Sequence, residues 1–172
     1  MEATLAVDGQ TAHSRQVAGD LAGKYLTFAL GAEEYGLPVL KVREIIKVMD
    51  ITQVPQMPAH VRGVINLRGK VIPVIDLRLK FGFPQQAYTE RTCIIVVDVA
   101  LQGMSVMMGI VVDSVSEVLN VTGAEIDQAP EFGDRVTTDY MLGLAKVKGT
   151  VKILLALDKV LGADGQVSHR VF

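Results

Sequence analysis

The sequence has little of what metal-binding, disulfide-linked or membrane-spanning proteins use. Its single cysteine, Cys93, excludes an intrachain disulfide and a cysteine-based metal cluster. The three histidines, His13, His60 and His169, are far apart and form no ligand-spaced group. The longest apolar run, residues 104–112, is less than half of the roughly 20 residues that a membrane helix needs. We therefore expect no metal, no cofactor and no direct membrane insertion.

Neither sign of charge dominates the chain, whose net charge is −2. Such a balance gives no global basic field to hold nucleic acid. The distribution is uneven, because residues 36–82 hold eight Lys or Arg against three acids, whereas residues 90–140 hold two Arg against nine acids. This asymmetry fits either two solvated faces that differ by chance or a connector whose two halves meet different partners.

What the chain does have is a surplus of β-branched residues. Valine and isoleucine together outnumber leucine about two to one, which favours strands. Residues 25–30, 91–99 and 105–113 are predicted strands, and residues 31–36 a turn. Residues 39–49 have apolar positions at helical spacing and are predicted as a short helix or a twisted strand end. The segments 63–77 and 144–157 are predicted hairpins, and a short helix is expected from Asp158.

Two segments repeat in the same order. Residues 36–48 align with residues 109–121, and residues 63–71 align with residues 143–151. The repeats predict two similar β-rich halves, about 36–83 with part of the chain ends and about 90–157. Residues 1–23 show no sustained periodicity and are predicted to be a flexible N-terminal tail, with the ordered part over 24–162 and a C-terminal tail over 163–172.

Local motifs for catalysis are missing. The segment Gly63 to Lys70 differs from a phosphate-binding loop, because five residues separate its glycines and Val71 follows the lysine. Asp76 and Asp158 each stand at a hairpin end, where a strand-end or helix-cap role explains them better than acid–base chemistry.

Two residues are left without a local structural reason. Arg68 stands at a turn in which Gly69 supplies the positive φ, so the arginine is predicted to be chosen for its guanidinium. Phe132 lies in an acidic loop with no periodic partner, and it either plugs a local core or anchors a partner surface.

Several motifs occur together in this chain. They are Glu34-Tyr35-Gly36-Leu37-Pro38-Val39, Val42-Arg43-Glu44-Ile45, Asn66-Leu67-Arg68-Gly69 with the Val-Ile-Pro-Val-Ile-Asp-Leu run that ends at Leu77, residues 109–119, and Ala129-Pro130-Glu131-Phe132. In combination they resemble the CheW family of bacterial chemotaxis coupling proteins. The resemblance covers residues 24–162. It implies a mainly β fold of two SH3-like five-stranded β-barrels that share a hydrophobic core, with short helices.

The resemblance also implies a function and its residues. The expected protein is a non-catalytic cytoplasmic adaptor, located at receptor arrays beneath the inner membrane. It would link the cytoplasmic hairpin tips of chemoreceptors to the regulatory domain of the histidine kinase CheA. The positions that match the receptor-binding surface are Val42, Glu44, Gly63, Arg68 and Val118. Those that match the kinase-binding surface are Gly69, Glu131 and Phe132.

Three alternatives stay open at this point. An adaptor of a parallel chemosensory system, such as one controlling pili, would have the same sequence features. A nucleic-acid-binding SH3-like barrel would need a continuous basic face, against which the acidic segment 90–140 argues. A small hydrolase would need a buried group of titrating side chains.

Overall fold

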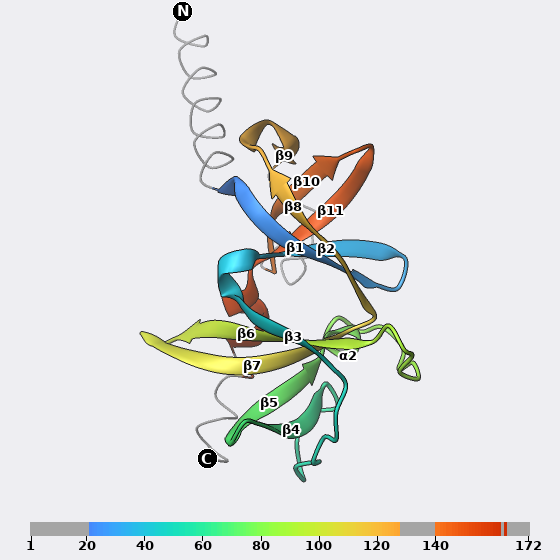
Figure 1. The fold of residues 1–172 in the computed structure, drawn as a ribbon, viewed down its shortest axis with the longest axis vertical. Helices are drawn as coiled ribbons and strands as arrows, with labels where there is room; N and C mark the ends of the chain where they lie inside the picture. The colour runs from blue at the N-terminus through green and yellow to red at the C-terminus, as the bar shows by residue number, and fades with distance from the viewer. Residues whose placement is uncertain (1–20, 128–139, 163, 165–172) are drawn as a thin grey trace, which may run out of the picture.

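The computed structural model describes residues 21–127, 140–162 and 164. Two β-sheets lie one above the other (Figure 1). In order across the six-stranded sheet, the strands are β8 (Ser114–Val121), β1 (Gly23–Leu30), β2 (Glu33–Pro38), β11 (Thr150–Leu155), β10 (Met141–Val147) and β9 (Ile126–Asp127). In order across the five-stranded sheet, they are β3 (Val42–Lys47), β6 (Cys93–Leu101), β7 (Met104–Val112), β5 (Lys70–Asp76) and β4 (Val61–Leu67).

Short helices join or follow the strands. They are the 3-10 helices η1 (Val39–Lys41) and η2 (Gly123–Glu125), the α-helix α2 (Leu77–Lys80) and a helical segment over residues 157–162, here called the C-terminal helix. Asp76 caps α2 by accepting hydrogen bonds from the backbone amides of Arg78 and Leu79, which confirms its predicted role. No helix within the described residues is long and apolar enough to cross a membrane.

Each sheet combines strands from both halves of the chain. In the six-stranded sheet, the hairpin β1–β2 pairs with β8 on one side and, in parallel, with β11 on the other. In the five-stranded sheet, the hairpin β6–β7 pairs with β3 on one side and, in parallel, with β5 on the other. The sheets therefore differ from the predicted halves, about 36–83 with part of the chain ends and about 90–157, because the five-stranded sheet consists of β3 to β7 and the six-stranded sheet of β1, β2 and β8 to β11.

The repeated glycines mark the parallel contacts. Gly36 in β2 lies opposite Leu154, and Gly109 in β7 lies opposite Val74. A Cβ atom at Gly36 would come within 2.9 Å of Leu154 Cδ2, and one at Gly109 within 2.9 Å of Ile94 Cγ2. The two segments that the sequence aligns thus occupy equivalent positions, where a missing side chain lets neighbouring groups pack closely.

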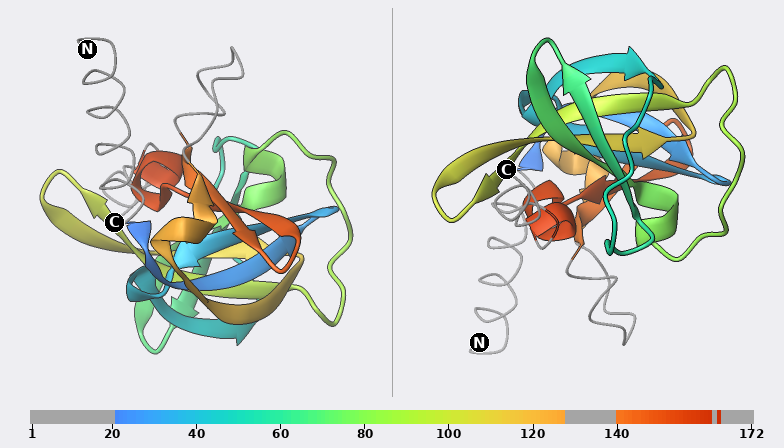
Figure 2. Two further views of the ribbon diagram at one scale, coloured as in Figure 1. Left: turned by 90° about the horizontal axis from the view of Figure 1, so that it is seen from above. Right: turned by 90° about the horizontal axis from the view of Figure 1, so that it is seen from below.

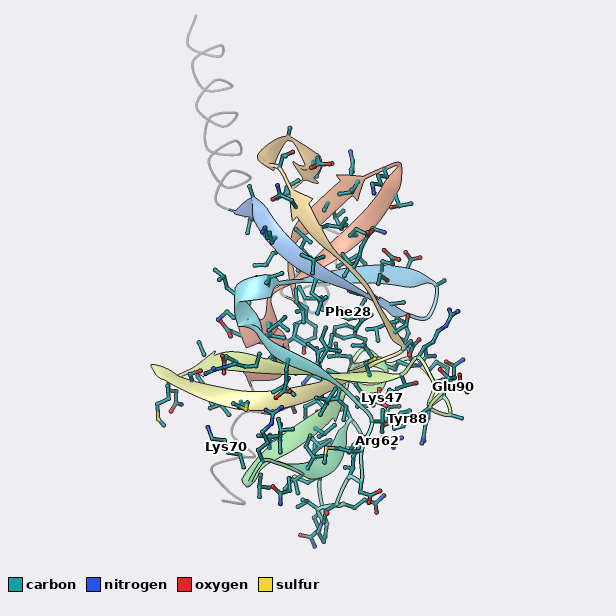
Figure 3. The ribbon with its side chains drawn as sticks, in the orientation of Figure 1. Phe28, Lys47, Arg62, Lys70, Tyr88 and Glu90 are labelled. Atoms are coloured by element: carbon teal, nitrogen blue, oxygen red, sulfur yellow. The ribbon has the colours of Figure 1, made fainter. Side chains whose placement is uncertain are left out.

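The core has three parts. The largest lies between the sheets, where Figure 3 shows Phe28 of β1. Phe28 and Ile95 of β6, which belongs to the same cluster, are both fully buried. A second cluster belongs to the six-stranded sheet and a third, which includes Ile65, to the five-stranded sheet. The predicted mainly β fold with two units around a shared core is therefore confirmed.

Two details of the predicted barrels differ. One sheet has six strands instead of five, because Ile126–Asp127 pairs with β10. Backbone hydrogen bonds among the described residues also do not join the edge strands, so both sheets are open rather than closed barrels.

The local predictions near the N-terminus need two corrections. The predicted turn 31–36 is only Gly31–Ala32, since β2 begins at Glu33 and pairs directly with β1. For residues 39–49 the sequence predicts a short helix or a twisted strand end, and the helix alternative is wrong, because one 3-10 turn is followed by strand β3. Burial alternates regularly along β3, so the helical spacing arises because the apolar Ile45 lies on the exposed side of the strand.

Candidate partner-binding site

Glu44 and Arg68 form a two-pronged ion pair on the five-stranded sheet. The Arg68 Nη1 atom lies 2.6 Å from Glu44 Oε1, and Nη2 lies 2.8 Å from Oε2. Glu44 lies on β3 at one edge of the sheet, and Arg68 lies in the β4–β5 turn at the other edge. The side-chain pair therefore bridges the two edges that the backbone leaves open.

Solvent reaches both partners of this pair. The Arg68 side chain is 74% exposed and that of Glu44 is 27% exposed. The hydrogen bond from Arg68, together with its positive charge, holds the pKa of Glu44 below its ordinary value of 4.5, although partial desolvation opposes the shift. The same contacts raise the pKa of Arg68. Both groups are thus charged at neutral pH. The planar guanidinium of Arg68 faces solvent, where a carboxylate or backbone carbonyl of a partner could compete with Glu44 for its N–H groups.

The backbone at Arg68 corrects one prediction. Arg68 has φ 52° and Gly69 has φ 86°, so both central residues of the turn are left-handed. This combination defines the type I′ turn, whose twist matches that of the flanking strands. The prediction that Gly69 alone meets the conformational demand is therefore wrong, because a non-glycine side chain sits in the unfavourable region at 68. Asn66 Oδ1 supports the turn by accepting a hydrogen bond from the Gly69 amide at 2.9 Å.

The other three predicted receptor-binding residues lie in different environments. Val42 begins β3, is half-buried and packs against the shared core. Val118 lies on β8 in the other sheet and is 55% exposed. Gly63 is buried, and a Cβ atom there would lie 2.0 Å from the Thr52 backbone oxygen. The structure thus brings Glu44 and Arg68 into contact, places Val42 on the same strand as Glu44, and gives Gly63 a packing role.

The predicted kinase-binding residues are only partly visible. Gly69 lies in the β4–β5 turn, and a Cβ atom there would meet nothing within 4 Å. Glu131 and Phe132 lie outside the described residues. Within the described part of the chain, Gly69 is therefore the only member of this set whose position can be given, and it directly follows Arg68.

Exposed apolar side chains near the candidate site were not predicted. Ile45 neighbours Glu44 and Val71 follows the β4–β5 turn, and both are more than two-fifths exposed. In the aligned repeats, Ile45 corresponds to Val118 and Val71 to Val151, which is also exposed. The repeat alignment contained this signal, since the predicted Val118 has Ile45 as its counterpart.

The buried polar side chains serve the fold. Thr27 bonds to the backbone of Glu117 in β8, and Thr92 Oγ1 accepts a hydrogen bond from the Thr89 amide. Asp76 caps α2. No group of three or more His, Cys, Asp or Glu residues within 21–127, 140–162 and 164 is arranged to hold a metal ion.

Loop 83–92 is tied to the five-stranded sheet by Tyr88. Arg62 Nε donates a hydrogen bond to the Tyr88 hydroxyl at 2.9 Å, and its guanidinium carbon lies 5.5 Å from the ring centroid (Figure 3). Burial raises the pKa of the Tyr88 hydroxyl. The phenol is therefore un-ionised at neutral pH and holds the loop against β4.

Comparison with known proteins decides the family. The CheW-like domain matches residues 24–164. The chain is 39% identical over 150 residues to the chemotaxis protein CheW of Klebsiella aerogenes, covering 87% of this chain and 88% of the relative. The chain belongs to the CheW-like family. It is also 37% identical to CheW of Bacillus subtilis, over 84% of this chain and 90% of the relative.

A solved structure extends the likeness to the fold. The scaffolding protein TtCheW of Thermoanaerobacter tengcongensis superposes with a TM-score of 0.73 at 33% identity, covering 84% of this chain and 96% of that chain. Membership of the CheW-like family confirms the predictions of a chemotaxis adaptor and of a protein without catalytic activity.

Proposed function

We propose that the chain couples the cytoplasmic hairpin tips of chemoreceptors to the regulatory domain of the histidine kinase CheA. In this proposal it acts in the cytoplasm, within arrays beneath the inner membrane. The observation that carries the proposal is the exposed Glu44–Arg68 pair on a scaffold that matches the CheW-like domain over residues 24–164. A rigid body with two docking surfaces raises the effective concentration of each partner for the other.

The proposed receptor surface centres on the Glu44–Arg68 pair. Val118 and Ile45 supply exposed apolar area of the kind that an amphipathic receptor hairpin would cover. Gly63 acts indirectly, because its missing side chain lets the backbone at Thr52 approach β4 and so positions the β4–β5 hairpin.

The proposed kinase surface includes Gly69, Glu131 and Phe132. Because Gly69 directly follows Arg68, the two surfaces meet at one turn. A receptor that changes the conformation of the Arg68 side chain would therefore act at the border of the proposed kinase surface. Phe132→Ala is expected to weaken binding of the CheA regulatory domain by about 2 kcal/mol, as is typical of an interface anchor.

Kinase activation with receptor fragments tests the proposal. The assay contains purified CheA, a receptor cytoplasmic fragment held on vesicles and the full chain. We expect the wild type to support receptor-dependent kinase activity, and Arg68→Lys to support much less, because an ammonium lacks the planar fork. Lys148→Ala is the matched control, since Lys148 is the first residue of the corresponding turn in the other sheet. Full activation by a folded Arg68→Glu variant would remove Arg68 from the proposed receptor surface.

Direct binding separates the two partners. Pull-down of the CheA regulatory domain and of the receptor fragment is expected with the wild type. Failure to bind either one, with a folded protein, would overturn the proposed function.

A further inference from the structure

The C-terminal helix, residues 157–162, continues from the last strand of the six-stranded sheet. Its apolar residues Leu157, Val160 and Leu161 are buried in the shared core, among side chains from both sheets. Figure 2 shows this helix, in red, on the same side of the molecule as α2 and opposite β3. Packing therefore places it where it touches both units.

The polar contacts at its first turn reach the five-stranded sheet. Asp158 Oδ1 accepts a hydrogen bond from the Ala100 amide of β6 at 2.8 Å. Asp158 Oδ2 lies 3.1 Å from Lys41 Nζ on η1, which leads into β3. The first turn of the C-terminal helix thus bonds to the five-stranded sheet, although the strand that precedes it, β11, belongs to the six-stranded sheet.

A second set of contacts lies at the other end of the helical segment, where Asp164 is also helical. Asp164 Oδ1 lies 2.7 Å from His60 Nε2, and Oδ2 lies 3.0 Å from Lys80 Nζ. Lys80 is in α2, and His60 immediately precedes β4. The backbone oxygen of His60 also accepts a hydrogen bond from the Asp76 amide at 2.8 Å. Both partners of Asp164 therefore flank strands of the five-stranded sheet.

Burial makes these contacts costly to separate. Asp164 is 4% exposed, and the Lys80 side chain is 11% exposed. The His60 side chain that pairs with Asp164 is itself only 21% exposed. Asp164 Oδ2 has no hydrogen-bond donor among the described residues and faces the Lys80 charge alone. Removing one partner of a buried ion pair leaves the other uncompensated, which is strongly destabilising.

We propose that Asp158 and Asp164 make the C-terminal helix a clamp between the two sheets, with His60, Lys80, Lys41 and the Ala100 amide as its anchor points. The clamp fixes the position of Val118 in one sheet relative to the Glu44–Arg68 pair in the other. A receptor hairpin that contacts both needs this fixed spacing, and this consequence rests on the proposed function. The five side chains are positioning residues that touch neither partner.

Hydrogen exchange of the full chain tests the clamp without any partner. Asp164→Asn keeps the shape of the side chain and removes its charge. We expect exchange of the Val160 and Leu161 amides to rise on the order of 100-fold, because the unpaired Lys80 favours opening of the helix. Exchange of the Ile94 and Ile95 amides in the five-stranded sheet should stay unchanged. His60→Gln retains an N–H donor, and its effect should be about tenfold smaller.

A matched control comes from the surface. Asp127→Asn removes the same charge from the Asp127–Lys146 pair, whose side chains are about half exposed or more. It should leave exchange in the C-terminal helix at the wild-type rate, because an exposed pair contributes little. If Asp164→Asn unfolds the whole chain, Asp158→Asn at the more exposed end provides the same test, with an expected rise in Val160 exchange of about tenfold.

The kinase assay then tests the link to function. The clamp predicts lower receptor-dependent activation for Asp164→Asn and wild-type activation for Asp127→Asn. Unchanged helix exchange in Asp164→Asn would overturn the clamp, and faster exchange with full activation would overturn its role in coupling. Failure of the wild type to activate the kinase would instead overturn the proposed function, while the exchange result would still decide the clamp.

Discussion

The two sheets have equivalent hairpins, each followed by a short helix. In the ion pair that each helix forms, the positions of the acid and the base are exchanged. In α2, which follows β5, Arg78 Nη1 lies 2.7 Å from Asp113 Oδ2, and that oxygen also accepts the Gly31 amide at 2.8 Å from the β1–β2 turn. At the equivalent place after β11, 80 residues later, the C-terminal helix has Asp158 paired with Lys41. Each helix thus binds the opposite sheet through a first-turn side chain, with the acid and the base exchanged.

The sheets also differ at their edges. Glu44 and Arg68 bridge the edges of the five-stranded sheet. Their counterparts in the aligned repeats, Glu117 and Lys148, form no ion pair with each other in the part of the chain that the structure describes. The six-stranded sheet instead gains β9 on one side. Repeated packing has thus been kept, while the exposed polar groups have diverged.

The largest expected effect tests whether the two sheets are one folding unit. Phe28→Ala removes a fully buried ring from the core that both sheets share. We expect a loss of about 3–5 kcal/mol in the free energy of unfolding. Denaturant melts should still show one transition, since neither sheet keeps a complete core alone. Two separate transitions would show that the sheets are independent units.

A glycine pair tests how far the repeat extends to the backbone. A Cβ atom at Gly63 would lie 2.0 Å from the Thr52 backbone oxygen, and one at the equivalent Gly143 would lie 2.8 Å from that of Asp127. Only Gly63 also has a positive φ, at 140°. Gly63→Ala should therefore cost at least about 2 kcal/mol of unfolding free energy, and Gly143→Ala about half as much.

Chemical denaturation of both variants measures this difference. Gly149→Ala is the control for backbone conformation alone, because its Cβ would meet nothing within 4 Å at φ 76°. Equal losses for Gly63→Ala and Gly149→Ala would show that the close approach of Thr52 contributes nothing.

The two equivalent turns separate stability from function. Arg68 and Lys148 have φ 52° and 53°, and each precedes a left-handed glycine. Asparagine tolerates this conformation better, so Lys148→Asn should raise the free energy of unfolding by about 0.5–1 kcal/mol, and Arg68→Asn by less, because it also removes the ion pair with Glu44. Only Arg68→Asn should reduce receptor-dependent kinase activation. Equal loss of activation in both variants would make the turns functionally equivalent.

The smallest expected effect is electrostatic. Glu44 has a lowered pKa in the folded state because Arg68 donates hydrogen bonds to it, whereas Glu125 has a lowered pKa because the Thr122 amide and hydroxyl do so. A folded pKa below the unfolded value contributes stability above about pH 4.5, and this contribution is lost as the pH falls through the folded pKa. Carboxyl NMR titration should show that Arg68→Asn returns the pKa of Glu44 towards 4.5 and leaves that of Glu125 lowered. A shift at both residues would point to a general change in the fold.

Local features were predictable because they depend on neighbours in sequence. The turns at Arg68-Gly69, Gln102-Gly103 and Lys148-Gly149 all occur where glycine follows a strand. The cap at Asp76 agrees with the strand-end or helix-cap role predicted from its place at a hairpin end. The family motifs placed Glu44 and Arg68 in one functional set, although they gave no contact between the two side chains.

The sequence by itself determined the strands β1, β6 and β7, the hairpins β4–β5 and β10–β11, the repeat and the family, because these depend on alternation, on φ preferences and on short motifs. Only the tertiary structure decided which hairpin joins which sheet, since β2 pairs with β11 more than 100 residues away and β7 pairs with β5 although α2, loop 83–92 and β6 lie between them in the chain. It also decided that Glu44 meets Arg68 and that Asp164 meets His60 and Lys80. Such contacts arise from packing two sheets on one core. No local preference of a charged residue specifies the partner that this packing places beside it.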